Sequence, residues 1–396
     1  MEKIELLAPA GDLERLKIAV MYGADAVFIG GKRFSLRSRA SNFEVEDIEQ
    51  GVIFAKKYGA KIHVTVNMLP HDDDLEGLQE YIRDLDRVGV YAVICASLYI
   101  AKKVVAMKTN LEVHLSTQQS SLNTLTTDFY KELGIERVVL GRELSIKQIE
   151  TISSNAEIEI EAFIHGGMCS NYSGRCTLSN YMTFRDANRG GCAQSCRWKY
   201  HVLENEKVIS DADVLFSMSS KDLMAAQYLP QLIKANVASL KIEGRMKSLY
   251  YIATVVRGYR HLIDGFYQDP SQLDIEYYID EITRAENRPV DTGFYEKNPD
   301  ESGHLYSQKS ENVTHDFLGR VLKVDGNKAL IQVRNKFEEN DVLEFFGPQQ
   351  KTFKLDFKSA YNEKKALMQN ICNVPMEEVW IDLPFIVEEN YLIRKG

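Results

Sequence analysis

The chain has 396 residues and a formal net charge of −9, with 48 Lys and Arg against 57 Asp and Glu. This length exceeds what one small core can hold and predicts two domains, or one large α/β domain with an appendage. With 44% hydrophobic and 27% charged residues and only 9 prolines, the composition excludes a disordered or collagen-like chain. The acidic total excludes a global positive field, so any RNA contact must use a local basic face.

The N-terminus and the apolar runs predict a cytoplasmic protein without membrane contact. Residues 1–5 lack the basic start and apolar stretch of a secretory signal, and the longest apolar run, Tyr91 to Ala101, is too short to span a bilayer. Four of the six cysteines lie between positions 169 and 196. Such crowding is not typical of a disulfide framework spread over a secreted chain.

Eight short β-branched runs alternate with amphipathic segments in residues 1–266. The predicted strands are Ile4 to Ala8, Ala26 to Gly30, Lys61 to Asn67, Ala92 to Ser97, Glu112 to Gln118, Arg137 to Gly141, Ile158 to His165 and Ala238 to Gly244. This alternation predicts an α/β fold, a TIM-like (β/α)₈ barrel, with an insertion over 166–237 between strands seven and eight. A doubly wound sheet is the alternative, but Ala8 to Asp12 is not a Gly-rich phosphate loop.

Polar side chains share the axis-facing positions of several predicted strands, because side chains alternate between the two faces of a strand. Near the C-terminal strand ends, where such barrels place their chemistry, stand Asn67, Gln118, Glu161, His165, Lys241 and Glu243. The alternative is a structural polar layer, for instance an ion pair between Lys241 and Glu161.

Four cysteines, Cys169, Cys176, Cys192 and Cys196, are predicted metal ligands with the spacing C-x6-C-x15-C-x3-C. Four thiolates can complete a tetrahedral zinc site or hold a 4Fe-4S cluster. Neither half contains the C-x2-C knuckle usual for structural zinc, and the polar flanks argue against free core cysteines. The residues alone leave iron-sulfur and zinc open. Cys95 and Cys372 are predicted core residues.

Basic residues recur after predicted strand ends and inside the insertion, so a barrel would gather them on one rim. They are Lys32, Arg33, Arg37, Arg39, Arg175, Arg185, Arg189, Arg197, Lys199, Arg245 and Lys247. Four aromatic residues, Tyr172, Tyr181, Phe184 and Trp198, lie among them and are suited to stack on an unpaired base. The alternative for any single basic residue is a solvated loop charge. The clustering favours phosphate contact.

Several motifs together resemble the collagenase-like peptidase family of unassigned catalytic type. They are Leu6 to Gly11, Glu161 to Cys169, Gly174 to Ser179, Arg189 to Cys192, Arg197 to Trp198, Ser219 to Leu223 and Ser239 to Ser248. Despite its name, this family includes enzymes that hydroxylate nucleic-acid or quinone substrates without molecular oxygen. The length and C-terminal extension look most like its tRNA uridine 5-hydroxylase branch.

The resemblance implies a 4Fe-4S cluster on the cysteines and conversion of a tRNA wobble uridine to 5-hydroxyuridine, with prephenate or a prephenate-derived donor required. Its fourth ligand varies between members, which makes Cys196 the least certain. In this interpretation Glu161, His165, Lys241 and Glu243 are catalytic. Substrate contacts fall to Asn67, Gln118, Arg175, Arg189, Arg197 and Arg245. An accessory protein and the oligomeric state are left open.

Two other functions remain as alternatives. A peptidase needs an activated nucleophile or metal-bound water, and the chain contains neither H-E-x-x-H nor G-x-S-x-G. A zinc-stabilised, non-catalytic RNA-binding protein would use the same cysteines as structural ligands.

The last part of the chain changes character. Residues 267–314 turn polar around one predicted helix, Ile275 to Ala285, and indicate a linker. Beyond it, short alternating runs begin with Leu318 to Val324, and the turn Asp325-Gly326 marks a hairpin. Residues 315–396 are therefore predicted to form a small antiparallel β-barrel domain.

Overall fold

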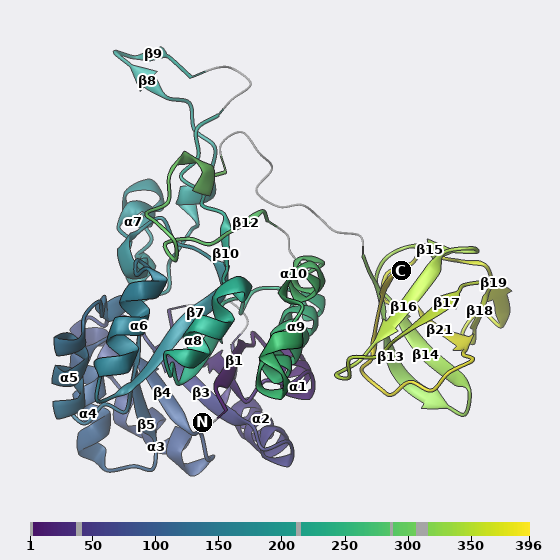
Figure 1. Cartoon of the computed structure of the whole chain (residues 1–396), viewed down its shortest axis with the longest axis horizontal. Coiled ribbons are helices and arrows are strands. Elements are labelled where there is room, and N and C mark those ends of the chain that lie inside the picture. Colours follow the sequence, from purple (N-terminus) through teal and green to yellow (C-terminus); the bar gives the residue numbers. More distant parts are fainter. Residues whose placement is uncertain (1–2, 37–41, 211–214, 286–287, 306–315) are drawn as a thin grey trace.

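The computed structural model describes residues 3–36, 42–210, 215–285, 288–305 and 316–396. Within these ranges an α/β unit is followed by a smaller β unit (Figure 1). The predicted basic residues Arg37 and Arg39 lie outside the described residues, as does the polar stretch 306–315 of the predicted linker.

Eight parallel strands form a closed barrel. They are β1 (Glu5–Pro9), β2 (Ala26–Gly30), β3 (Lys61–Val66), β4 (Ala92–Cys95), β5 (Glu112–Leu115), β6 (Arg137–Val139), β7 (Glu159–Gly167) and β11 (Ser239–Ile242). Each strand pairs with the next, and β11 pairs with both β7 and β1, which closes the ring. The barrel prediction is confirmed, and the doubly wound alternative is wrong.

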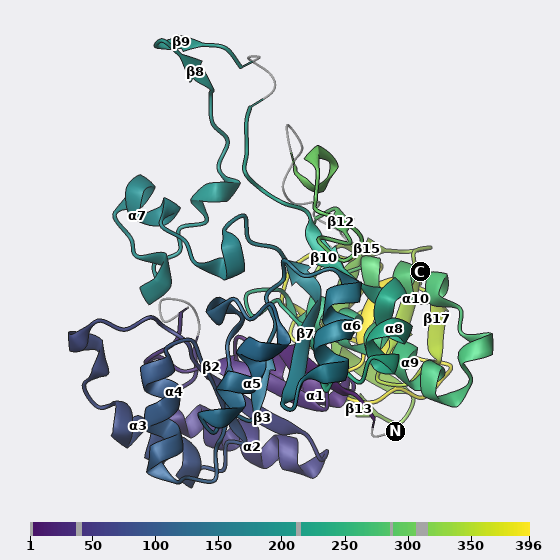
Figure 2. The same ribbon diagram turned by 60° about the vertical axis from the view of Figure 1, so that its left-hand side comes forward.

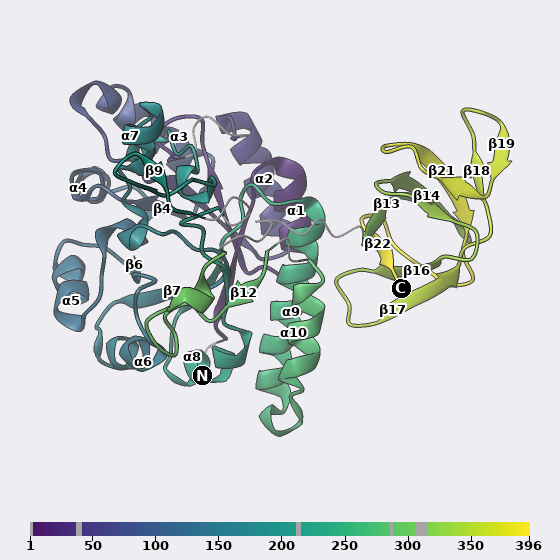
Figure 3. The ribbon, with the colours of Figure 1, turned by 90° about the horizontal axis from the view of Figure 1, so that it is seen from above.

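Helices surround the barrel (Figure 3). They are α1 (Leu13–Met21), α2 (Val45–Lys57), α3 (Leu78–Arg87), α4 (Leu98–Met107), α5 (Thr124–Glu132), α6 (Ile146–Asn155), α8 (Leu229–Lys234) and α9 (Leu249–Gln268). Several start at a side-chain N-cap: Asp12, Asn123 and Ser248 each accept a hydrogen bond from a backbone N–H of the first turn. None of the helices that the structure describes is both long and apolar enough to cross a bilayer.

The insertion between β7 and β11 lies over one end of the barrel (Figure 2). It contains the short helix α7 (Leu178–Thr183) and a projecting hairpin of β8 (Leu203–Glu204) and β9 (Lys207–Val208). The chain then returns as β10 (Asp222–Met224), which pairs antiparallel with the end of β7. The insertion starts where β7 ends and finishes where β11 begins. Because β7 and β11 pair to close the barrel, both ends of the insertion lie at the closing strand pair.

A β-bulge near the end of β7 changes which side chains reach the barrel axis. Lys241 of β11 pairs with Phe163, but the next residue, Ile242, pairs with His165, so β7 carries one extra residue here. His165 therefore packs outward against Tyr251 and Tyr259 of α9, with ring centroids 5.8 and 5.6 Å apart. The prediction that His165 faces the axis is wrong, because strict alternation ignores the bulge.

The described part of the predicted linker packs on the barrel unit. Helix α10 (Ile275–Thr283) lies against α9, and Tyr278 and Ile282 belong to the main hydrophobic core. Strand β12 (Val290–Asp291) pairs with β10 and extends the barrel sheet. Residues 267–285 and 288–305 thus add a layer to the α/β unit.

An eight-stranded antiparallel sheet forms most of the C-terminal unit, in the order β17-β16-β22-β13-β14-β21-β18-β19. The strands are β13 (Phe317–Asp325), β14 (Lys328–Val333), β16 (Val342–Phe346), β17 (Thr352–Asp356), β18 (Ala360–Asn362), β19 (Leu367–Gln369), β21 (Glu378–Asp382) and β22 (Leu392–Lys395), and β15 (Phe337–Glu338) pairs separately with β20 (Ile371–Cys372). Asp325 pairs with Lys328 across the predicted turn, which confirms that hairpin.

The C-terminal unit covers the outer side of α9. Phe346 and Leu392 belong to the same hydrophobic core as α9. Arg257 of α9 donates to the carbonyl oxygens of Gln349 and Gln350, at 3.0 and 2.7 Å from Nη2. Together with the packing of α9 on α1, α10 and β1, these contacts bury α9 along most of its length.

The bulge generates a stability prediction for Gly166. Its φ is +106°, and a Cβ there would lie 2.3 Å from the backbone oxygen of Glu243. We expect Gly166→Ala to lower the free energy of unfolding by more than about 2 kcal/mol, because strain and a backbone clash act together. Urea denaturation measures the change.

The matched control is Gly326→Ala, at a turn where φ is +59° and a Cβ would meet nothing within 4 Å. Gly326→Ala should lower the free energy of unfolding by about 1 kcal/mol, because it introduces backbone strain without a clash. Equal losses in the two variants would contradict a clash at the bulge.

Candidate functional site

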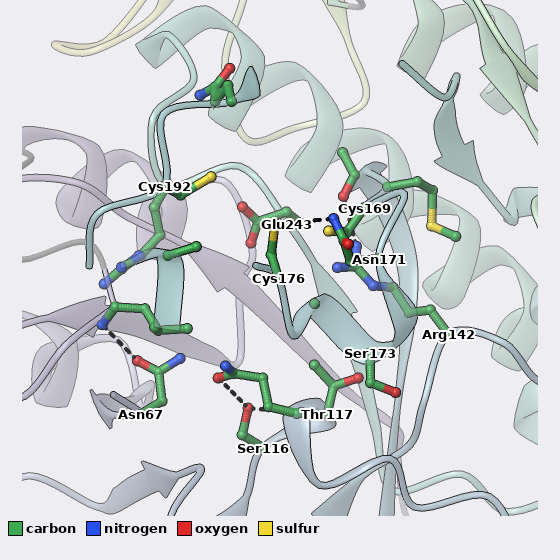
Figure 4. A pocket seen from close by; sticks show the side chains of 18 of the residues that line it. Asn67, Ser116, Thr117, Arg142, Cys169, Asn171, Ser173, Cys176, Cys192 and Glu243 are labelled. Carbon is green, nitrogen blue, oxygen red and sulfur yellow. Dashed lines mark hydrogen bonds between the residues drawn. The ribbon is translucent and has the colours of Figure 1, made fainter. Parts of the chain in front are cut away.

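A cavity of about 470 Å³ opens at the C-terminal end of the barrel, beneath the insertion (Figure 4). Strand ends supply Thr65, Asn67, Ser116 and Gln118, and the insertion supplies Cys169, Cys176, Cys192 and Cys196. Polar residues from the strand ends and the cysteines of the insertion therefore line the same cavity. Its volume is in the range of small-molecule and cofactor sites.

The barrel side of the wall is held by short polar contacts. Asn67 accepts a hydrogen bond from the backbone N–H of Leu36, at 3.1 Å, and Thr65 donates to the carbonyl of Ile29, at 3.1 Å. Gln118 follows β5 in a 3-10 turn (Thr117–Gln119) and is only 3% exposed. Both predicted substrate-contact residues of this side, Asn67 and Gln118, line the cavity.

Lys241 reaches the cavity from a buried ion-pair network. Its Nζ lies 2.6 Å from Glu161 Oε1, and Arg137 Nη1 lies 3.4 Å from Glu161 Oε2. Burial alone would raise the pKa of Glu161, but the charges of Lys241 and Arg137 outweigh it and lower that pKa. Glu161 therefore stays ionised, has no proton to donate near neutral pH, and orients Lys241.

Of the four predicted catalytic residues, Lys241 and Glu243 line the cavity. Glu161 lies below the cavity, in the ion pair with Lys241 that was the alternative to a catalytic role. His165 lies outside the barrel wall, with Nδ1 3.3 Å from the Tyr259 hydroxyl. The difference arises because Glu161 stands deeper along β7 and because the bulge turns His165 away.

Two of the four predicted arginines line the cavity. Arg245 is 6% exposed, and its Nη1 lies 3.2 Å from the Thr65 hydroxyl; Arg197 lies on the insertion side. Arg175 is exposed on the surface of the insertion and is absent from the cavity wall. Arg189 instead forms a two-point ion pair with Asp74, at 2.7 and 2.8 Å, which fixes the insertion to the loop after β3.

The sequence analysis missed Arg142. It lines the cavity, donates to the carbonyl of Gly167 at 2.7 Å and lies over the ring of Phe163, 4.7 Å from the centroid. The residue directly follows the sixth predicted strand, so the strand-end criterion applied to the other residues would have found it. With Arg197, Lys241 and Arg245 it makes this wall strongly cationic.

Two buried histidines form a layer below the ion pair. The rings of His63 and His114 meet edge to face with centroids 4.9 Å apart, and both are fully buried. His114 Nε2 lies 3.0 Å from Glu112 Oε2, whereas neither ring nitrogen of His63 has a hydrogen-bond partner in the described part of the chain. Burial, with the nearby His114 and Arg137, lowers the pKa of His63 well below 6.5.

The four predicted ligand cysteines are free thiols around the same cavity. The Asn188 side chain fixes the backbone of Cys176, accepting from its N–H at 3.3 Å and donating to its carbonyl at 3.0 Å. Burial raises the pKa of Cys196, and so do the neighbouring thiols of Cys169 and Cys192. Cys95 and Cys372 are buried elsewhere.

This donor set suits a metal cluster by type and by location. Four free thiols open on one cavity, and Arg142 and Arg197 on its wall would offset thiolate charge. Among the described residues, no three His, Cys, Asp or Glu side chains are grouped closely enough to hold one metal ion. The loops that carry the cysteines must therefore come closer to share a cluster.

Comparison with known proteins gives two family matches. Residues 11–305 match the model of peptidase family U32, and residues 313–394 match the model of the peptidase family U32 C-terminal domain. Together these two matches span the barrel unit and the C-terminal β unit.

Three curated relatives are similar over much of the chain. A Bacillus subtilis protein named tRNA hydroxylation protein P1 is 43% identical over 100% of this chain and 95% of its own length. The Escherichia coli tRNA hydroxylation protein P is 32% identical, over 99% and 96%. The Escherichia coli 23S rRNA 5-hydroxycytidine C2501 synthase is 40% identical over 68% of this chain and 41% of its own length.

His63 generates a pH prediction. The unfolded chain takes up a proton at this histidine as pH falls below about 6.5, whereas the folded protein does not until lower pH. The unfolded state then binds more protons, so the free energy of unfolding falls as the solution is acidified. We expect His63→Leu to lose less stability than the wild type between pH 8 and pH 5.5, as measured by urea denaturation.

His71→Leu is the matched control, since His71 lies in an exposed turn. Between pH 8 and pH 5.5, the free energy of unfolding of His71→Leu should fall by the same amount as that of the wild type. A wild-type loss that persists unchanged in His63→Leu would show that other groups govern the acid sensitivity.

Proposed function

Because the chain belongs to peptidase family U32, and because relatives that match it over nearly their whole length are named for tRNA hydroxylation, we propose that it is an enzyme that hydroxylates RNA nucleotides. One structural observation supports the proposal: a single cavity combines four free cysteines with polar side chains suited to a nucleobase. In this cavity Lys241 and Glu243 are the groups positioned for proton transfer.

The substrate that we propose is a tRNA whose unpaired wobble uridine becomes 5-hydroxyuridine. An unpaired base can enter a cavity without breaking a duplex. In the insertion, close in sequence to the cavity-lining Leu178 and Ser179, Phe184 is 97% and Tyr181 82% exposed, and Arg175 and Arg185 are exposed as well. Aromatic rings interleaved with cations are the usual means of holding single-stranded RNA, by stacking and phosphate contact.

The cofactor that we propose is a 4Fe-4S cluster held by Cys169, Cys176, Cys192 and Cys196. Such a cluster supplies one-electron transfers when bound. The chain's part is to provide four thiolates, one of them on Cys176, whose backbone Asn188 holds, and cations at Arg142 and Arg197 that favour the anionic ligand set. Zinc on the same cysteines is the alternative, and it would make the site structural.

Replacement of C–H by C–OH at the uracil ring is a two-electron oxidation and needs both an oxidant and an oxygen source. We propose that prephenate or a prephenate-derived donor, rather than molecular oxygen, fills both roles: it gives its hydroxyl to ring carbon 5, takes up the hydrogen that leaves this carbon, and is thereby reduced by two electrons. Prephenate is a dicarboxylate, and the cavity wall offers Arg142, Arg245 and Lys241 to carboxylate groups. These cations support the proposed donor by charge.

The first test concerns the substrate. Deleting the gene should remove or strongly lower 5-hydroxyuridine and its derivatives in the host's tRNA, because the step that introduces the hydroxyl is lost. Nucleoside mass spectrometry of purified tRNA measures this. The wild-type gene should restore the modification. An unchanged nucleoside profile would contradict the tRNA assignment, and cleavage of a collagen peptide by the purified protein would favour the peptidase alternative.

The second test concerns the metal. Protein purified without air should be brown, with absorbance at roughly 400 nm and about four iron atoms per chain. Cys176→Ser should remove the colour and the iron, because it deletes a thiolate ligand. Cys372→Ser is the matched control, since this buried cysteine lies in the C-terminal unit, and it should keep both. Colourless protein that contains zinc would contradict the iron-sulfur proposal.

A further inference from the structure

Gln118 presents an unsatisfied hydrogen-bond donor at the cavity. Its side chain lines the cavity, yet the residue is 97% buried, since its exposed fraction is 3%. Among the described contacts its Nε2 has no hydrogen-bond partner. An amide N–H₂ buried without an acceptor is unfavourable by about 1–3 kcal/mol, so a ligand that supplies an acceptor gains that free energy on binding.

Ser116 fixes which end of this amide faces the ligand. The Ser116 hydroxyl donates to Gln118 Oε1, at 3.5 Å, and accepts the backbone N–H of Gln118, at 3.3 Å (Figure 4). In this orientation Nε2 is the end of the amide without a hydrogen-bond partner among the described contacts. The group offered to the cavity is therefore the N–H₂ donor rather than the carbonyl oxygen.

The rest of this wall suits a flat, partly apolar ring. Phe28, Ile94, Val139 and Phe163 line the cavity from β2, β4, β6 and β7. Lys241 Nζ lies over the Phe28 ring, 4.6 Å from the centroid, so the cation that Glu161 orients lies beside one of these apolar side chains. A pyrimidine has apolar faces and a polar edge, which matches apolar side chains beside one directed donor.

We propose that Gln118 Nε2 donates a hydrogen bond to the 4-carbonyl oxygen of uracil and thereby selects uracil over cytosine. Uracil has an acceptor at position 4, whereas cytosine has an amino group there, so a fixed donor meets a matching group in one base and a second donor in the other. The 2-carbonyl is common to both bases and cannot discriminate. Carbon 5 adjoins carbon 4, so this contact also fixes where the reacting edge lies within the cavity that Lys241 lines.

This inference rests on the proposed function and deepens it, because it names the base and the residue that reads it. A relative of this chain is named for 5-hydroxycytidine formation, so the distinction between the two pyrimidines is one that this family must make. A site that hydrogen-bonds one substrate group rejects an analogue that lacks it far better than an apolar pocket does.

The experiment compares two anticodon stem-loop RNAs that differ only in U or C at the wobble position. Fluorescence anisotropy should give at least about 10-fold tighter binding of the U form by the wild type. Gln118→Leu should weaken the U form about 10-fold or more and bring the U-to-C ratio to within about twofold, because the donor is lost.

Two further variants separate base reading from a structural role. Gln118→Glu presents an acceptor and should reverse the preference toward C, which a merely structural residue would not do. Ser116→Ala frees the amide to turn over, so it should raise affinity for the C form several-fold and leave the U form nearly unchanged. Gln119→Leu makes the same chemical change one residue away, where the side chain donates to the carbonyl of Ala96 and not into the cavity, and should keep the wild-type ratio.

The outcomes distinguish this inference from the proposed function. Wild-type protein that binds neither RNA overturns both together. Wild-type binding with a U-to-C ratio that stays unchanged in Gln118→Leu and Gln118→Glu overturns the reading by Gln118 alone. Circular dichroism of each variant confirms folding, and a reversed ratio in folded Gln118→Glu supports the inference even where Gln118→Leu is unstable.

Discussion

The buried ion pair between Lys241 and Glu161 joins β11 to β7, the two strands that close the barrel. Separating these charges would leave the buried Lys241 without this carboxylate partner, which is strongly destabilising. Both strands also bound the insertion, so the seam sets where the cysteine-bearing segment leaves and returns. The position of the cavity, its cationic wall and the insertion that covers it all depend on this closure.

The cavity brings together four thiols and a group of cationic side chains, whose charges would be complementary once the thiols ionise. Thiols of the insertion become anionic when they bind metal, and Arg142, Arg197, Lys241 and Arg245 stand on the same wall. The cations therefore favour an anionic cofactor and an anionic substrate. This local balance also explains how a chain with a net charge of −9 can offer RNA a favourable surface.

Much of the fold could be predicted from the sequence, because buried parallel strands and amphipathic helices have distinct periodicities. Alternation correctly placed Asn67 and Gln118 in the cavity and predicted Lys241 beside Glu161. It failed at His165, since a bulge is set by tertiary packing and leaves no mark in the two-residue period. The polar composition of 267–305 concealed that Tyr278 and Ile282 pack on α9.

Other parts of the site lie beyond a sequence pattern. The ion pair of Arg189 with Asp74 depends on where two loops meet, so no local signal distinguishes it from a phosphate contact. The same holds for Gln118 Nε2. That it has no hydrogen-bond partner in the described part of the chain depends on which side chains surround it in the fold. The cysteine spacing marks a donor set and does not specify the metal.

The most direct test of base entry into this cavity is photo-crosslinking with a stem-loop RNA that carries 4-thiouridine at the wobble position. Mass spectrometry of the digested complex then locates the attached peptide. The crosslink should map to strand ends of the barrel mouth, on the segments that contain Ser116 to Gln118 or Phe163. Crosslinks confined to the C-terminal unit or to the outer helices would contradict a base-binding cavity at the mouth.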